Sequence, residues 1–259
     1  EVVSASGILE KNVTETFEIP EGILPNVGQV DVSVQPNIGN GLQKGLDYLV
    51  YYPYGCSEQK TSGLLANLMY EELVKLKVTE TSSTQMERAK QNVRDTIKVL
   101  VSTQRANGGW SFWSDYDKTY PWLTGYVMWG LTQAQKAGFD VDSAVLERAD
   151  EYLRDALQMS NASGYDGISD AERAQVLFML SERNTNDLSG YAATLYERRE
   201  GLPEFAKLFL ALAYKNVEKD RTSTRAAQLL NEVRNKVIYL NPSTAYVKEK
   251  EGYYDLLSS

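Results

Sequence analysis

The distribution of apolar residues among successive helical segments is the feature of this sequence that most constrains its fold. Four segments are apolar almost all round, as is typical of helices that protein surrounds: 64–70, 126–131, 176–180 and 208–213. The segments between and after them have one apolar stripe and one charged face: 86–100, 146–157, 191–200 and 225–237. Buried inner helices wrapped by amphipathic outer helices satisfy both patterns. We therefore predict a mainly α fold, an α/α toroid, and prefer it to a solenoid, whose helices usually keep one polar face each.

The expected helices lie near 41–51, 57–76, 84–104, 121–137, 143–158, 170–183, 187–199, 203–217 and 222–237. Two capping boxes, Thr84 with Glu87 and Ser169 with Glu172, and two first-turn prolines, Pro121 and Pro203, mark helix starts. The four inner helices fall short of a closed ring, and the tail 241–259 shows no helical period. We expect an incomplete toroid, truncated on its C-terminal side, in a larger protein.

Residues 1–38 differ from the rest because apolar and polar residues alternate there between prolines, which predicts two or three β-strands. We therefore divide the chain into a β-rich segment, 1–38, and a helical domain, 39–259.

Composition excludes several classes of function. The net charge is −8, from 27 basic and 35 acidic residues, which opposes nucleic-acid binding. No run of about 18 apolar residues is present, so no membrane span is expected. The sequence contains no histidine, which excludes His-based acid–base catalysis and His metal ligands, and its single cysteine excludes internal disulfides. We expect no cofactor and no metal.

The motif PYGCSEQ (53–59) carries the clearest chemistry. Cys56 stands at the entry to a helix, where the thiolate form of cysteine is favoured. Gln59 follows three residues later, so the two side chains share one face of the first turn. Attack of the thiolate on the Gln59 amide, with loss of ammonia, would close a thioester. Water would destroy that bond, and we expect Tyr52 and Tyr54 to shield it.

Other interpretations remain open. Cys56 could be an inert, buried residue of a helical scaffold. Gln104, Gly108 and Trp110 fit the Q-x-x-x-G-x-W pattern of terpenoid cyclases, which also use α/α toroids, so an enzyme of that type is an alternative. The acidic residues that such an enzyme needs are sparse, with SDYD (114–117) as the sole candidate. We prefer an architectural role for this pattern.

The segment GCSEQ (55–59) resembles the GCGEQ-type thioester motif of the α2-macroglobulin and complement family, and YPYGCSEQ (52–59) resembles its bacterial members. The segments 18–36, 107–113 and 121–128 match the same family in order. The resemblance implies that Cys56 and Gln59 form the thioester, with Gly55 and Glu58 as structural neighbours. It also implies an α/α toroid, and makes 1–38 part of a neighbouring CUB-like β domain.

The function implied by the resemblance is a broad-spectrum endopeptidase inhibitor outside the cytoplasm, periplasmic or secreted, in bacterial defence. A protease cuts another domain of the same protein, and the exposed thioester acylates the protease through lysine amines. Such a single-use trap is not an enzyme and needs no catalytic residue. Because the chain lacks histidine, we expect direct attack by amines. A thioester adhesin or opsonin-like domain for surface attachment is an alternative.

Overall fold

The computed structural model describes residues 14, 16, 55–75, 83–114, 118–159, 167–218, 223–241 and 244–248. The chain divides into two compact units, Glu1–Ile38 and Gly39–Ser259, and every described helix and strand belongs to the second. The strands predicted within 1–38 and the helix predicted over 41–51 lie outside the described residues.

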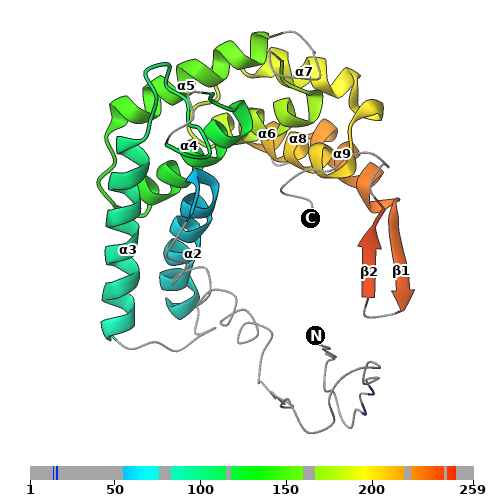
Figure 1. Ribbon diagram of the computed structural model, residues 1–259. Coiled ribbons are helices and arrows are strands. Elements are labelled where there is room, and N and C mark those ends of the chain that lie inside the picture. Colours follow the sequence, from blue (N-terminus) through cyan, green and yellow to red (C-terminus); the bar gives the residue numbers. More distant parts are fainter. Residues whose placement is uncertain are drawn as a thin grey trace, which may run out of the picture. The chain divides into compact units, whose positions relative to one another are not determined.

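The helices of the described residues form an inner and an outer layer (Figure 1). The inner helices are α2 (Ser57–Lys75), α4 (Pro121–Lys136), α6 (Asp170–Ser181) and α8 (Glu204–Val217). Each inner helix packs on the next inner helix along the chain. The outer helices are α3 (Ser83–Ser102), α5 (Ser143–Gln158), α7 (Ser189–Glu197) and α9 (Thr224–Arg234). This alternation confirms the predicted α/α toroid.

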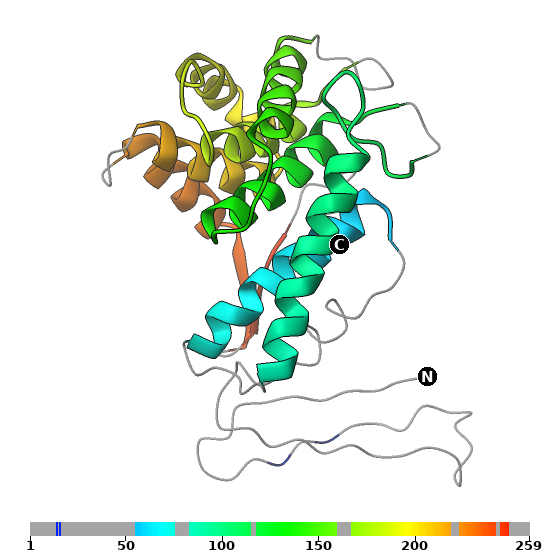
Figure 2. The ribbon, with the colours of Figure 1, turned by 90° about the vertical axis from the view of Figure 1, so that its left-hand side faces the viewer.

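The inner helix α4 and the outer helix α3 bury different fractions of their surfaces, as their sequences predict. The inner helix α4 buries residues all round, from Trp122 to Ala134, because α2, α3, α5 and α6 pack against it. The outer helix α3 buries a single stripe: Ala89, Val93, Ile97 and Leu100. It lies beside α2 (Figure 2) and has its charged residues on its other faces. Burial of the apolar stripes in a common core is the main favourable term in the folding of such a layer.

Helix boundaries agree with the sequence where a local signal is present. Ser169 and Glu172 form the predicted capping box at the start of α6, and Pro121 opens α4. Two predictions were wrong by one residue. The helix α3 begins at Ser83, so Thr84 lies inside its first turn, and Pro203 directly precedes α8. The predicted helix 187–199 is the shorter α7, followed by a 3-10 turn, η1 (Arg199–Gly201).

The prediction for the C-terminal part was also incomplete. Helix α9 ends at Arg234, and the chain continues as an antiparallel hairpin of β1 (Val237–Asn241) and β2 (Thr244–Val247), with Val237 opposite Val247. The β-branched and aromatic residues of VIYLN and TAYV, on either side of a proline, are a strand signal that the sequence analysis missed.

The loop after α3 shows what the Q-x-x-x-G-x-W pattern does in this chain. The Gln104 side-chain amide donates to the carbonyl oxygens of Gly108 (2.9 Å) and Val145 (2.8 Å), and its oxygen accepts from Arg148 (3.1 Å). The fully buried Trp110 donates from Nε1 to the Leu100 carbonyl (2.8 Å). These bonds join the end of α3 to α5, which supports the architectural role.

No helix of the described residues is long and apolar enough to cross a membrane.

Gly108 allows this loop to approach α5 closely, which predicts a large effect of Gly108→Ala. Its φ is +86°, and an added Cβ would lie 2.2 Å from the Arg148 carbonyl oxygen. Gly138 is a matched control, with a φ of +90° and no neighbouring atom within 4 Å of such a Cβ. Both substitutions strain the backbone, but only Gly108→Ala adds a clash, so it should lower the free energy of unfolding by about 1–3 kcal/mol more. Urea denaturation measures both, and equal losses would contradict the steric argument.

Candidate functional site

Cys56 and Gln59 meet at the start of α2. Cys56 directly precedes the helix and is buried, with 8% of its surface exposed, whereas Gln59 in the first turn is exposed. The backbone N–H of Cys56 donates a hydrogen bond to Oε1 of Gln59 at 3.1 Å. The first N–H groups of a helix have no partner within the helix, and the Gln59 side chain supplies one here. The predicted pair is thus held together across a single turn.

Gly55 leaves room for the Gln59 side chain. A Cβ at position 55 would lie 2.9 Å from Cβ of Gln59 and 3.3 Å from its Oε1. The first distance is shorter than a carbon–carbon contact permits, so a larger residue would displace the Gln59 amide from the Cys56 backbone. This contact gives Gly55 a steric reason for its place in the motif.

Glu58 is connected to α4 through two hydroxyl groups. Ser62 Oγ donates to Oε1 of Glu58 at 2.9 Å and lies 3.0 Å from the hydroxyl of Tyr126. A serine hydroxyl has one hydrogen, which is already directed at Glu58, so Tyr126 must donate to Ser62. Burial raises the pKa of Tyr126 above its usual 10; the bond with Ser62 opposes this shift and the charge of Glu58 adds to it.

The loop that follows Trp110 fixes the start of α2 from the other side. The Ser57 N–H donates to the Phe112 carbonyl (2.9 Å), and Ser57 Oγ donates to the Ser111 carbonyl (2.7 Å). The Phe112 ring packs against Tyr120 and Trp122, with centroids 5.3 Å and 5.7 Å away. The sequence analysis noted this loop but missed its contact with the motif, because no local pattern encodes it.

The remaining predictions for the site have different outcomes. Tyr52 and Tyr54, the expected shield, lie outside the described residues, as do Asp115 and Asp117 of the SDYD segment. Within the described ranges, no three His, Cys, Asp or Glu residues are grouped so as to hold a metal ion.

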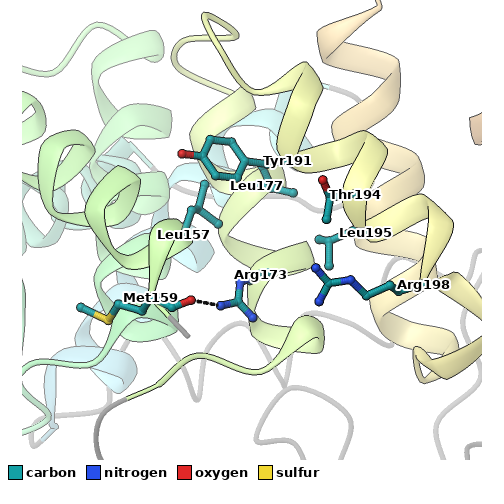
Figure 3. Close-up of a pocket in the computed structure, with 8 residues that line it drawn as sticks. All are labelled: Leu157, Met159, Arg173, Leu177, Tyr191, Thr194, Leu195 and Arg198. Atoms are coloured by element: carbon teal, nitrogen blue, oxygen red, sulfur yellow. Dashed lines mark hydrogen bonds between the residues drawn. The ribbon is translucent and has the colours of Figure 1, made fainter. Parts of the chain in front are cut away.

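A cavity of about 380 Å³ lies between α5, α6 and α7, which do not carry the motif (Figure 3). Its walls are mixed: Leu157, Leu177 and Leu195 line one part, and polar side chains line much of the rest. Its two arginines, Arg173 and Arg198, both pair with Asp170, at 3.2 Å and 3.3 Å, and Arg173 also donates to the Met159 carbonyl. These interactions join the three helices, and we interpret the cavity as a structural junction.

Inner and outer helices in alternation, with a Gly-Cys-Ser-Glu-Gln turn opening an inner helix, define a helical toroid domain of the macroglobulin and complement type. A family model described as "A-macroglobulin TED domain" matches residues 29–169, and the chain belongs to that family. The family prediction from the motif is therefore confirmed.

Bacterial α2-macroglobulins are among the similar proteins. The Escherichia coli protein is 33% identical over 156 residues, which are 56% of this chain and 9% of that protein. Salmonella α2-macroglobulin reacted with methylamine has a TM-score of 0.61 and 26% identity, over 78% of this chain and 13% of that one. Trypsin-activated E. coli α2-macroglobulin has a TM-score of 0.57 and 27% identity, over 70% and 13%. The chain thus spans about a tenth of the length of these relatives.

The Glu58–Ser62–Tyr126 contacts predict coupled effects of substitution. Ser62→Ala removes the acceptor for Tyr126, and Tyr126→Phe removes the donor, so each should lower the free energy of unfolding by about 1 kcal/mol. The double variant should lose less than the sum, because both changes remove the same bond. A double-mutant cycle by urea denaturation tests this, and strictly additive losses would show that the two hydroxyls do not interact.

The raised pKa of Tyr126 predicts a specific loss of stability in alkali. The folded state binds the phenol proton more tightly than the unfolded state, so this contribution is complete below pH 10. It is lost as the pH rises from 10 through the folded-state pKa. The difference in unfolding free energy between wild type and Tyr126→Phe should therefore shift against the wild type above pH 10. A difference that stays constant up to pH 12 would contradict the shift.

Proposed function

We propose that Cys56 and Gln59 form an internal thioester, and that the protein carrying this domain traps attacking proteases by acylating their amines. The observation that carries the proposal is the 3.1 Å hydrogen bond from the Cys56 N–H to Gln59 Oε1, next to the buried thiol. It holds the amide to be attacked beside the residue that attacks it.

The closing step uses only these two residues. The Cys56 sulfur attacks the Gln59 amide carbon, a C–S bond forms, the C–N bond breaks, and ammonia leaves with the thiol proton. Negative charge develops on Oε1 during this attack. The Cys56 N–H already donates to that oxygen, so it can stabilise the charge as an oxyanion-hole donor does. Oε1 remains as the carbonyl oxygen of the thioester. The Cys56 N–H can therefore also stabilise the charge on this oxygen when an amine later attacks the thioester.

The trapping step consumes the thioester. A neutral lysine amine attacks the acyl carbon, the C–S bond breaks, and the products are an amide and a free Cys56 thiol. The acyl group of residue 59 stays bonded to the captured lysine nitrogen and the thioester is not regenerated, so the site acts once and the protein is an inhibitor rather than an enzyme. An unassisted amine is a stronger nucleophile than a neutral hydroxyl, and with no histidine in this chain we expect amines to be the main targets.

The relatives support a protease as the target. One similar structure is of an E. coli α2-macroglobulin activated by trypsin, and another is of a Salmonella α2-macroglobulin reacted with methylamine, a small amine. We carry both properties over to this protein as part of the proposal. A role against foreign proteases also implies a location outside the cytoplasm, in the periplasm or beyond, and further domains that the protease cuts.

The proposal predicts the behaviour of two variants of the protein that carries this domain. In the freshly made wild type the Cys56 thiol should not be titratable, and the measured mass should be lower than the mass calculated from the sequence by one ammonia. Cys56→Ala should form no denaturant-resistant adduct with trypsin, while its free energy of unfolding stays within about 1 kcal/mol of wild type. Gln59→Ala should keep a free thiol and also form no adduct.

Intact mass, thiol titration and denaturing gels measure these outcomes, with the exposed Gln91→Ala on α3 as a matched glutamine control. A wild type that retains both the thiol and the ammonia from the outset would refute the thioester. Equal adducts from Cys56→Ala would refute its role in trapping.

A further inference from the structure

The peptide group between Cys56 and Ser57 is held at both ends. Its carbonyl oxygen accepts from the Lys60 N–H at 3.0 Å, which is an ordinary bond of the helix. Its N–H donates to the Phe112 carbonyl at 2.9 Å, outside the helix. The N–H groups of a first turn usually turn to water or to a capping side chain. Here a backbone carbonyl of a distant loop takes this place, so the loop orients the peptide that leaves Cys56.

The Ser57 side chain adds a second bond to the same loop. Its hydroxyl donates to the Ser111 carbonyl at 2.7 Å, and both residues are buried, with 8% and 4% of their surfaces exposed. The Ser57 carbonyl accepts from the Thr61 hydroxyl at 2.7 Å. A buried hydroxyl that loses its acceptor costs stability, so this geometry is strongly preferred over others.

These bonds limit the freedom of the reacting groups. With the backbone of Cys56 fixed on its C-terminal side by the loop and on its N-terminal side by Gln59 Oε1, mainly one side-chain torsion remains to place its sulfur. Ring closure between two side chains is fast only when the reacting atoms are held close to the geometry of attack. A small rotation of the Cys56–Ser57 peptide would move the sulfur away from the Gln59 amide.

We infer that Ser57 is a positioning residue for thioester closure. Its hydrogen bonds to the Ser111 and Phe112 carbonyls fix the backbone of Cys56 in the position that closure requires. Ser57 itself contacts neither the sulfur nor the amide carbon, and acts through the placement of Cys56. This inference rests on the proposed function, since it concerns the rate at which the proposed bond forms. It assigns to Ser57, between the two reacting residues, a role that the spacing of Cys56 and Gln59 does not reveal.

The test follows closure in the protein that carries this domain, made by cell-free synthesis and sampled over time for thiol content and loss of ammonia. Ser57→Ala removes the hydroxyl bond and keeps the N–H bond to Phe112, so closure should be about 3- to 10-fold slower than in wild type. Ser181→Ala is the control, because the buried Ser181 on α6 also donates to a backbone carbonyl, that of Phe178, at 2.7 Å; it accepts from Asn216 at 3.0 Å as well and lies away from the motif. It should lower the melting temperature similarly and leave closure at the wild-type rate.

A second pair keeps the test valid if Ser57→Ala does not fold. The side chains of Ser57→Thr and Ser57→Val have nearly the same shape and differ in the hydroxyl. The thioester should therefore form about 3- to 10-fold faster in Ser57→Thr than in Ser57→Val. Equal closure rates within this pair, or a Ser57→Ala rate equal to that of Ser181→Ala, would overturn the inference. A wild type that never loses ammonia would instead refute the proposed thioester, and the two failures are therefore distinguishable.

Discussion

The buried hydrogen bonds of Trp110 hold the structure around the motif together. Its indole N–H donates to the Leu100 carbonyl at the end of α3, and its backbone N–H donates to the Thr124 hydroxyl in the first turn of α4. Its carbonyl accepts from Tyr120, just before α4. The side chain is fully buried, so water cannot replace these bonds. The next two residues, Ser111 and Phe112, accept hydrogen bonds from Ser57 through their carbonyl oxygens. The backbone geometry at Cys56 therefore depends on the position of Trp110.

The two residues of the proposed thioester have unequal environments. Cys56 is buried, while Gln59 is exposed in this domain. Burial of the sulfur protects the side of the bond from which the thiol leaves, but an exposed acyl group is open to water. A thioester in this setting needs cover over Gln59, either from Tyr52 and Tyr54 or from other domains of the protein. The matched part is 56% of this chain but only 9% of the E. coli relative, so that relative is about six times as long as this chain and has further parts that could provide such cover.

The layered arrangement of the toroid could be predicted because the distribution of apolar residues around each helix depends on whether protein or water surrounds it. A helix enclosed by protein is apolar all round, and a helix on the outside is apolar on one stripe. Single residues at helix ends were less predictable. Ser169 with Glu172 was correct, and Ser169 has the extended backbone that an N-cap residue needs, with a ψ of 158°. Thr84 with Glu87 fits the same pattern but lies inside the helix, and there Glu87 pairs with Arg94 instead. The hairpin after α9 was missed because the helical period was extended too far.

The sequence alone determined the family, the alternation of inner and outer helices, and the nearness of Cys56 to Gln59, because Gln59 lies in the first turn of the helix that Cys56 directly precedes. Only the tertiary structure decided what surrounds that pair. Ser57 contacts Ser111 across 54 residues of sequence, and Ser62 contacts Tyr126 across 64. Such contacts depend on how α2, α4 and the Trp110 loop pack, and packing is a property of several segments at once, which no local pattern can encode.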